Sequence, residues 1–208
     1  MLLIRPGFIS QSISDELIAA FRLIDKNWVS GDSHVRKWPY RTAISAVLLK
    51  EAGIPGLDER LSQVRQQAAD AVCEFYGISE ATYIDYTLMT EMKVGDSVPM
   101  HADNQEYSDK GDWLPNHTHY HHCTANLYLN TCGVDYEGGQ LRFSSIQESV
   151  VPQNGLLVGF LSGREYQHEV TPIKIGCRYN ISLWVTLDPA RAERWDYSDI
   201  RPQNRLGS

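Results

Sequence analysis

Cysteine is scarce in this sequence, and the cysteines that are present form no recognisable framework. The 208 residues contain four cysteines, Cys73, Cys123, Cys132 and Cys177, and none of them makes a Cys-x-x-Cys pair. This spacing argues against a disulfide scaffold and against a cysteine-rich zinc site. The four residues are interpreted as free thiols in a reducing cytoplasm.

Long apolar runs and an excess of basic charge are also missing. The N-terminal segment MLLIRPGFIS has a short apolar start broken by Pro6 and Gly7, so it predicts neither a signal peptide nor a membrane span. Acidic residues outnumber basic ones and the net charge is −7, which argues against nucleic acid or an anionic membrane as the main partner. Length and composition fit one globular domain, residues 1–208.

The first 80 residues carry helical patterns. Residues 12–28 offer Ser12 or Ser14 as an N-cap, and their apolar side chains recur at helical spacing. Residues 43–53 and 57–77 repeat the pattern, and Gly77 ends the second of these segments. Residues 1–80 are therefore predicted to form an N-terminal helical support.

After Glu80 the sequence changes to short runs rich in Tyr, Thr, Val and Ile between turn residues. Strands are predicted over residues 82–94, 122–130, 139–144, 154–163 and 179–187. Short strands between turns are typical of a sandwich or a jelly-roll barrel. The predicted fold is mainly β with flanking helices (α+β). Its β core spans 81–189, with a loop at 113–121 and a C-terminal tail at 190–208.

Two histidines and an aspartate form a candidate metal site. His101 and Asp103 are two residues apart near the predicted start of a strand, so both side chains point to one face. His168 begins a later apolar run and is expected on a facing strand. Two imidazoles and one carboxylate occupy three positions of an octahedral iron(II) and leave the opposite face open for a cosubstrate and oxygen. Taken alone, a histidine near a strand start is more often a hydrogen-bonded surface residue than a metal ligand.

Polar residues alternate along two predicted strands near this site. Arg178 shares a strand face with Asn180, Ser182 and Trp184, and an arginine inside a barrel is costly unless it pairs with an anion. Its planar guanidinium matches a carboxylate; the alternative is that it points outward from an edge strand. On the other strand, Thr124, Asn126 and Tyr128 share a face. The hydroxyls of Thr124 and Tyr128 are candidates to bind the same carboxylate, although Tyr128 is also typical of a core aromatic residue.

Together these motifs resemble the prolyl hydroxylase branch of the iron(II)/2-oxoglutarate oxygenases. The ordered series HADN, LYLN, EGGQLRF and GLLVGFLSGREYQHEVTPIKIGCRYNISLWVTLDP is similar to the catalytic domain of collagen prolyl 3-hydroxylases (leprecans), from Tyr83 to Pro189. The resemblance implies a double-stranded β-helix, a cupin-like jelly roll. It also implies a dioxygenase that hydroxylates an unactivated C–H bond using O2 and releases succinate and CO2, with ascorbate as the expected reductant.

The same resemblance assigns roles to individual residues. The iron ligands would be His101, Asp103 and His168. The cosubstrate would be bound by Arg178, Tyr128, Thr124, Asn126 and Trp184, with Arg178 on the C5 carboxylate of 2-oxoglutarate. Gly138 and Gly139 would form a tight turn that needs backbone freedom. The leprecans also carry long additional regions and a secretory address that this sequence lacks, so collagen is not expected as the substrate.

Three residues are candidate substrate contacts: His122, Asn104 and Met92. Met92 stands where these hydroxylases commonly have a tyrosine, which leaves a contact from that position in doubt. Asn104 begins a stretch rich in turn residues that is expected to cover the site and select the substrate, together with Trp38 to Thr42. The alternative for Trp38 to Thr42 is a helix-entry turn.

Histidine is concentrated just before the Tyr128 strand, at His117, His119, His121 and His122. The interpretations are a second metal site with Cys123, a wall of the substrate pocket, or a mobile polar loop, and the loop is favoured for the first three. His122 shares strand parity with Thr124, so it alone is expected to face the pocket.

The expected substrate is a prolyl residue in a peptide or protein. A free amino acid or small metabolite is the alternative within the enzyme class. A catalytically silent metal- or ligand-binding module is the alternative from another class. The sequence leaves the regiochemistry and the oligomeric state open.

Overall fold

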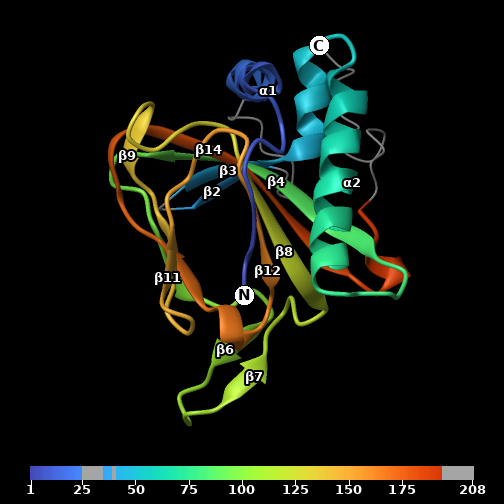
Figure 1. Ribbon diagram of the computed structural model, residues 1–208, viewed down its shortest axis with the longest axis vertical. Helices are drawn as coiled ribbons and strands as arrows, with labels where there is room; N and C mark the ends of the chain where they lie inside the picture. Colours follow the sequence, from blue (N-terminus) through green and yellow to red (C-terminus); the bar gives the residue numbers. More distant parts are fainter. Residues whose placement is uncertain (25–34, 39–40, 194–208) are drawn as a thin grey trace, which may run out of the picture.

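Two antiparallel sheets form the centre of the computed structural model, which describes residues 1–24, 35–38 and 41–193 (Figure 1). The main sheet has eight strands, in the order β1-β12-β8-β14-β4-β3-β2, with β9 paired to β14. These strands are β1 (Leu3–Arg5), β12 (Leu157–Leu161), β8 (His121–Tyr128), β14 (Ile173–Thr186), β4 (Tyr83–Lys93), β3 (Arg41–Ser45), β2 (Val35–Trp38) and β9 (Tyr136–Gly138). Neighbouring strands along this path pair antiparallel.

The second sheet is smaller and faces the main one. Its order is β11-β10-β13-β5, and the strands are β11 (Glu148–Val150), β10 (Leu141–Phe143), β13 (His168–Val170) and β5 (Val98–His101). A separate hairpin, β6 (Gln105–Tyr107) with β7 (Trp113–Pro115), projects from one end of the molecule (Figure 1). The prediction of a mainly β fold with flanking helices is confirmed.

Alternation along the central strands divides the interior into two cores. On β14, Tyr179, Ile181, Leu183 and Val185 face the helices and belong to the larger core. The intervening residues of β14 line a cavity between the sheets, beside a second core that includes Tyr128, Phe143 and Phe160. The period of two therefore sends every second residue of β14 toward the cavity.

Two α-helices cover the outer face of the main sheet (Figure 1). These are α1 (Gln11–Leu23) and α2 (Leu57–Phe75), and α2 packs against β8, β14, β12 and β4. The Ser10 side chain accepts a hydrogen bond from the main-chain N–H of Ile13 and so caps α1, in place of the predicted Ser12 or Ser14. Among the described residues, no helix combines the length and apolar character that crossing a membrane requires.

The predicted helical support over residues 1–80 contains strands as well as helices. β1, β2 and β3 all join the main sheet, and the segment predicted as a helix over 43–53 begins in β3 and continues as a 3-10 helix, η1 (Ala46–Ala52). Trp38 pairs with Arg41 across β2 and β3, so this segment does not form a helix entry. Strand β7 lies inside the loop predicted at 113–121. Most of the predicted tail, 194–208, falls outside the described residues, as do Pro39 and Tyr40, and Pro189–Arg191 form a short 3-10 helix, η3.

The Glu-Gly-Gly turn needs glycine for steric reasons, as predicted. Gly138 has φ +85°, and a Cβ there would lie 2.1 Å from the carbonyl oxygen of Pro172. Gly139 has φ +64°, and its Cβ would lie 2.9 Å from Cδ of Arg178. The turn thus brings main chain against the Arg178 side chain, where no larger residue fits.

Candidate metal and cosubstrate site

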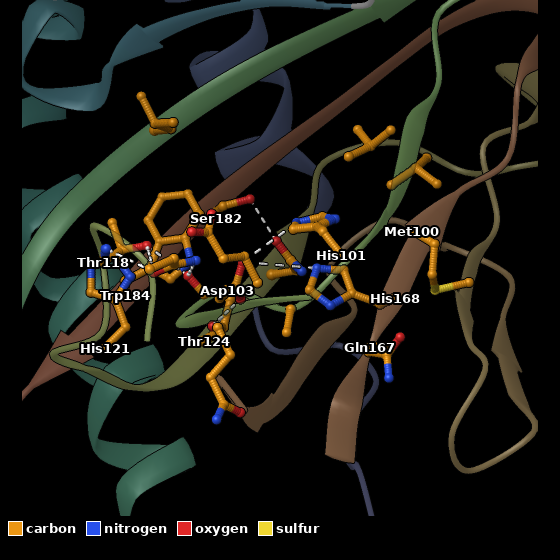
Figure 2. A pocket seen from close by; sticks show the side chains of 18 of the residues that line it. Met100, His101, Asp103, Thr118, His121, Thr124, Gln167, His168, Ser182 and Trp184 are labelled. Atoms are coloured by element: carbon orange, nitrogen blue, oxygen red, sulfur yellow. Dashed lines mark hydrogen bonds and ion pairs between the residues drawn. The ribbon is translucent and has the colours of Figure 1, made fainter. Parts of the chain in front are cut away.

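The predicted metal ligands lie together and line the cavity (Figure 2). His101 ends β5 and pairs in register with His168, the first residue of β13, and their ring centroids are 4.3 Å apart. Asp103 follows β5, and its Oδ1 lies 3.6 Å from His101 Nε2 and 4.0 Å from His168 Nε2. One ligand atom from each residue falls within 4.8 Å of the other two. This spacing suits a single metal ion with an open face.

Main-chain carbonyls fix the tautomer of both histidines. His101 Nδ1 is 2.9 Å from the carbonyl oxygen of Pro99, and His168 Nδ1 is 3.0 Å from that of Tyr166. A carbonyl oxygen only accepts, so each Nδ1 carries the hydrogen and donates it. Each Nε2 then directs its lone pair toward the shared metal position, which is the usual arrangement of histidine ligands.

Asp103 is held by both its side chain and its main chain. Thr124 Oγ1 donates to Asp103 Oδ2 at 2.6 Å, while Thr118 and Asn116 donate to its main-chain carbonyl. Burial opposes ionisation of the carboxyl, but the two histidines and the Thr124 hydroxyl outweigh it and hold the pKa of Asp103 below its ordinary value. The carboxylate is therefore ionised and oriented before any metal arrives.

The cavity opens from this triad and has a volume of about 960 Å³. His101 contributes an exposed edge, with 39% of its side chain accessible, whereas the Asp103 and His168 side chains are each 7% accessible. A metal ion here would contact protein on one side and the cavity on the other, which leaves room for further ligands.

Arg178 lies in the same cavity as a buried cation without an anion. The residue is 3% exposed, and its Nη1 donates to Asn180 Oδ1 at 2.9 Å and lies 3.1 Å from Met92 Sδ. Its guanidinium carbon is 5.0 Å from the centroid of the Tyr128 ring. Within the described part of the chain, no carboxylate pairs with Arg178 and its Nε has no hydrogen-bond partner. Because a buried charge is costly unless it is paired, we expect an anionic ligand to bind beside Arg178.

Two buried phenols complete the surroundings of Arg178. The hydroxyls of Tyr128 and Tyr136 have no hydrogen-bond partner among the described residues. Burial raises the pKa of both phenols, and the Arg178 charge only partly offsets it, so both remain neutral O–H donors. A carboxylate can pair with the Arg178 cation and accept hydrogen bonds from the two phenol O–H groups. The residues present thus fit a dicarboxylate that reaches from a metal ion to Arg178.

Tyr136 was not anticipated from the sequence. It stands at the start of β9, where it pairs with Gly176 of β14 and so approaches Arg178 from across the sheet edge. Its only sequence signal is its position directly before the Glu-Gly-Gly turn.

A chain of hydrogen bonds leads from Arg178 along β14 and joins the remaining predicted polar residues. Asn180 Nδ2 donates to Ser182 Oγ at 2.9 Å, and Ser182 Oγ donates to Asn126 Oδ1 at 2.5 Å. Each donor in the chain uses its neighbour as acceptor, so the order of amide and hydroxyl groups is fixed. This brings Asn126 to the cavity, as expected.

The structure gives Thr124 a partner other than the expected one. Its hydroxyl lies against Asp103 and Ser162, while Tyr128, two inward positions further along β8, lies beside Arg178. Trp184 lines the cavity, and its ring stacks on His121 at a centroid distance of 5.8 Å and an interplanar angle of 19°. Figure 2 shows Trp184 and His121 on one side of Asp103 and the two metal-site histidines on the other.

The prediction that His122 faces the pocket is wrong. His121 is the buried residue and lines the cavity, whereas His122 is exposed and bonds to the Tyr120 carbonyl. The register between β14 and β8 shifts between Val185 and Thr186, so that Thr186 pairs with His121. This irregularity breaks the period of two on which the prediction rested.

The positions of the other two candidates, Asn104 and Met92, do not favour contact with the substrate. Asn104 Nδ2 donates to the His121 carbonyl, and the residue does not line the cavity. Met92 is fully buried against Arg178 and lines the inner end of the cavity. Of the remaining histidines of the cluster, His117 is exposed at the cavity and His119 is exposed outside its lining. Outside the triad, the described residues hold no group of ligands placed for a second metal.

Sequence comparison finds a family model and curated relatives that match parts of this chain. Residues 87–186 match the model of the 2OG-Fe(II) oxygenase superfamily. Prolyl 3-hydroxylase 2 of Gallus gallus is 29% identical over 162 residues, which are 69% of this chain and 23% of that protein. Prolyl 3-hydroxylase 1 of Homo sapiens is 42% identical over 76 residues, which are 34% of this chain and 10% of that protein. The chain spans less than a quarter of the length of these curated relatives.

Solved structures with the same fold are also found. A viral collagen prolyl hydroxylase from Paramecium Bursaria Chlorella virus-1, in complex with 2OG, matches with a TM-score of 0.62 and 16% identity over 88% of this chain and 94% of that one. A prolyl hydroxylase from Trichoplax adhaerens, bound to a hypoxia inducible factor peptide fragment, gives 0.60 and 19% over 91% and 85%. The predicted jelly-roll core and the resemblance to prolyl hydroxylases are confirmed.

Proposed function

Because residues 87–186 match the model of the 2OG-Fe(II) oxygenase superfamily, we propose that this protein hydroxylates a prolyl residue in a peptide or protein. One observation carries the proposal beyond the family match. Arg178, which has no carboxylate partner among the described residues, lines the same cavity as the His101, Asp103 and His168 triad. The phenols of Tyr128 and Tyr136, also without a hydrogen-bond partner in that part of the chain, lie beside Arg178. A metal site and a carboxylate site are thus within one enclosure, as a 2-oxoglutarate enzyme requires.

Bound iron(II) and 2-oxoglutarate supply the oxidising chemistry, in which a C–H bond, O2 and 2-oxoglutarate give a C–OH group, succinate and CO2. The protein's part is to bind and orient. His101, Asp103 and His168 would hold the metal, and the Nδ1 hydrogen bonds of both histidines keep each Nε2 lone pair directed at it. Thr124 fixes the Asp103 carboxylate and keeps one of its oxygens occupied.

Arg178, Tyr128 and Tyr136 would bind the far carboxylate of 2-oxoglutarate. All three are buried, so water competes little for the anion and the ion pair is strengthened. The chain from Asn180 through Ser182 to Asn126 holds Arg178 in place and presents polar atoms along the path of the cosubstrate. Trp184 would close the side of the site that faces the substrate.

Several narrower assignments belong to the same proposal. Residues 1–208 are taken as a single oxygenase domain, with ascorbate as the reductant that keeps iron in the ferrous state. A reducing, cytoplasmic location is supported by the four free thiols. A peptide substrate is favoured over a free amino acid because the cavity at 960 Å³ is joined to an exposed aromatic hairpin, with Tyr107 63% exposed.

The test is succinate formation, measured by NMR under air with iron(II), 2-oxoglutarate and ascorbate, with and without a pool of proline-containing peptides. Peptide-stimulated succinate, together with a peptide mass increase of one oxygen atom, supports the proposal, and Asp103→Ala should abolish both. Succinate that no peptide stimulates favours a free amino acid or metabolite as substrate. No succinate from iron-loaded protein would favour the silent binding module.

A further inference from the structure

The cavity extends well beyond the part that the cosubstrate would occupy. Its volume of about 960 Å³ lies near the upper end of the range of drug-sized ligand sites, roughly 300–1,000 Å³, and 2-oxoglutarate is much smaller than such ligands. At a rise of about 3.4 Å per residue, Trp184 lies about 20 Å along β14 from Arg178. A short dicarboxylate cannot span that distance, so the Trp184 end belongs to the substrate.

A buried aspartate–histidine pair stands at this end. His121 Nε2 is 2.8 Å from Asp85 Oδ2, and the side chains are 6% and 15% accessible. The carboxylate accepts, so the hydrogen sits on Nε2. His121 Nδ1 has no hydrogen-bond partner in the described part of the chain, and both residues line the cavity. Asp85 Oδ1 also makes no hydrogen bond there, so the pair has unused acceptor capacity.

Aromatic rings surround the pair. Trp184 stacks on His121, and Tyr120 meets the His121 ring edge-on at 5.0 Å. Tyr86 pairs with Trp184 across β4 and β14 and lines the cavity. Tyr107 and Trp113 of the β6–β7 hairpin also line the cavity, with ring centroids 5.4 Å apart. Carboxylates set among aromatic faces attract cations through charge and through the ring quadrupoles.

The charge of the cavity wall points the same way. Asp85 and Glu106 line it together with the metal ligand Asp103. Among the described lining residues, the one lysine or arginine is Arg178, at the opposite end and committed to the cosubstrate. Arg191 lies outside this lining, with its guanidinium carbon 3.9 Å from the centroid of the Tyr120 ring. Within the cavity an anionic substrate group would meet the carboxylates of Asp85 and Glu106, whereas a cationic group would neutralise them.

We propose that Asp85, oriented by His121 and walled by Trp184, is a subsite for the cationic side chain of a lysine or arginine adjacent to the hydroxylated residue. This inference rests on the proposed function, since it names the class of peptide that the same site takes. Asp85 would contact the cation directly, and His121 acts as a positioning residue that fixes the carboxylate. Basic peptides are selected and acidic ones rejected.

Binding and turnover together test the subsite. The probes are three proline-centred peptides that differ only at the residues flanking proline, which are lysine, norleucine or glutamate. Their affinities are measured by calorimetry with zinc-loaded protein and saturating 2-oxoglutarate, because zinc has no redox chemistry and turnover is blocked. The same peptides are then assayed for succinate with iron(II) under air. Asp85→Asn is compared with Glu165→Gln, which alters an exposed carboxylate outside the cavity, 67% accessible.

Wild-type protein is expected to bind the lysine peptide about tenfold more tightly than the norleucine peptide, the size of one charged hydrogen bond. Asp85→Asn should remove this preference while 2-oxoglutarate binding persists, and Glu165→Gln should keep it. Equal affinity for the three peptides, no measurable peptide binding, or a preference that survives Asp85→Asn overturns the subsite. A lysine preference in binding without succinate formation supports the subsite and contradicts the proposed function instead.

Discussion

Removal of the Arg178 charge should weaken the binding of 2-oxoglutarate strongly while it changes the stability of the fold little. In the Arg178→Met variant, an unbranched apolar side chain replaces a cation that is 3% exposed. The lost interactions in the free protein are one hydrogen bond to Asn180 and contacts with Met92 and Tyr128. No ion pair with a described residue is lost.

The expected magnitudes differ sharply between the two states. Replacement of a buried charge by an apolar side chain is commonly neutral or stabilising, so the free energy of unfolding of the free protein should change by no more than about 1–2 kcal/mol. That corresponds to about 2–8 °C in Tm for a chain of this length. A bound dicarboxylate, by contrast, would lose its buried counter-ion at a cost of about 3–5 kcal/mol. Affinity for 2-oxoglutarate should therefore fall between about a hundredfold and a few thousandfold.

The assay combines thermal unfolding without ligand and calorimetric titration of 2-oxoglutarate into zinc-loaded protein. Arg142→Met is the matched control, because Arg142 is 54% accessible on β10 and its nearest carboxylate oxygen, on Glu169, is 3.9 Å away. The control should leave 2-oxoglutarate affinity unchanged. Unaltered affinity in Arg178→Met, or a free protein destabilised by many kilocalories, would refute the view that Arg178 is kept for an external anion.

Three further predictions concern the metal ligand and the glycine turn. Thr124→Val removes the hydroxyl that donates to Asp103 Oδ2 at nearly constant volume, so metal affinity measured by zinc competition should fall about 10–100-fold while Tm changes little. Gly138→Ala should destabilise the protein by about 2–4 kcal/mol in urea unfolding, because the new Cβ meets the Pro172 carbonyl. Gly133→Ala, with a similar φ of +86° and open space around the Cβ, should cost about 1–2 kcal/mol. The pKa of Asp103 is held below its ordinary value of about 3.9, so the stability that its carboxylate contributes is present above that pH and is lost as the pH falls further. Urea unfolding of metal-free wild type and Asp103→Asn should accordingly differ at neutral pH and converge in strong acid; a gap that stays constant with pH contradicts the assignment.

The sequence was most informative where a strand keeps its period of two. Alternation alone placed Arg178, Asn180, Ser182 and Trp184 on one face of β14, and all four line the cavity. His101 and Asp103 also meet as predicted, but for a different reason: His101 is the last residue of β5 and Asp103 lies past its end, where Asn116 and Thr118 hold its main-chain carbonyl.

Irregular pairing explains the main error. The His122 prediction extended the alternation of β8 across a register shift, and the shift turned His121 inward instead. Such a shift depends on the partner strand and leaves no local pattern in the sequence.

Long-range pairing explains what was missed. Strands β1, β2 and β3 are short, and β1 and β3 pair with strands at distant positions, so their sequence signal was weaker than that of the neighbouring helices. Asp85 lines the cavity from β4 and Tyr136 lies beside Arg178 from β9, and each acquires its significance from a partner far along the chain. Residue type alone did not distinguish them from other tyrosines and aspartates.

The most direct test of the central claim is whether a metal ion and 2-oxoglutarate bind in one cavity and depend on each other. Calorimetry would compare titration of 2-oxoglutarate into zinc-loaded protein, metal-free protein and Asp103→Ala protein supplied with zinc. The structure predicts tight binding to the zinc-loaded wild type and at least a tenfold loss in the other two, because the ligand bridges the triad and Arg178. Equal affinity in all three would contradict a shared site.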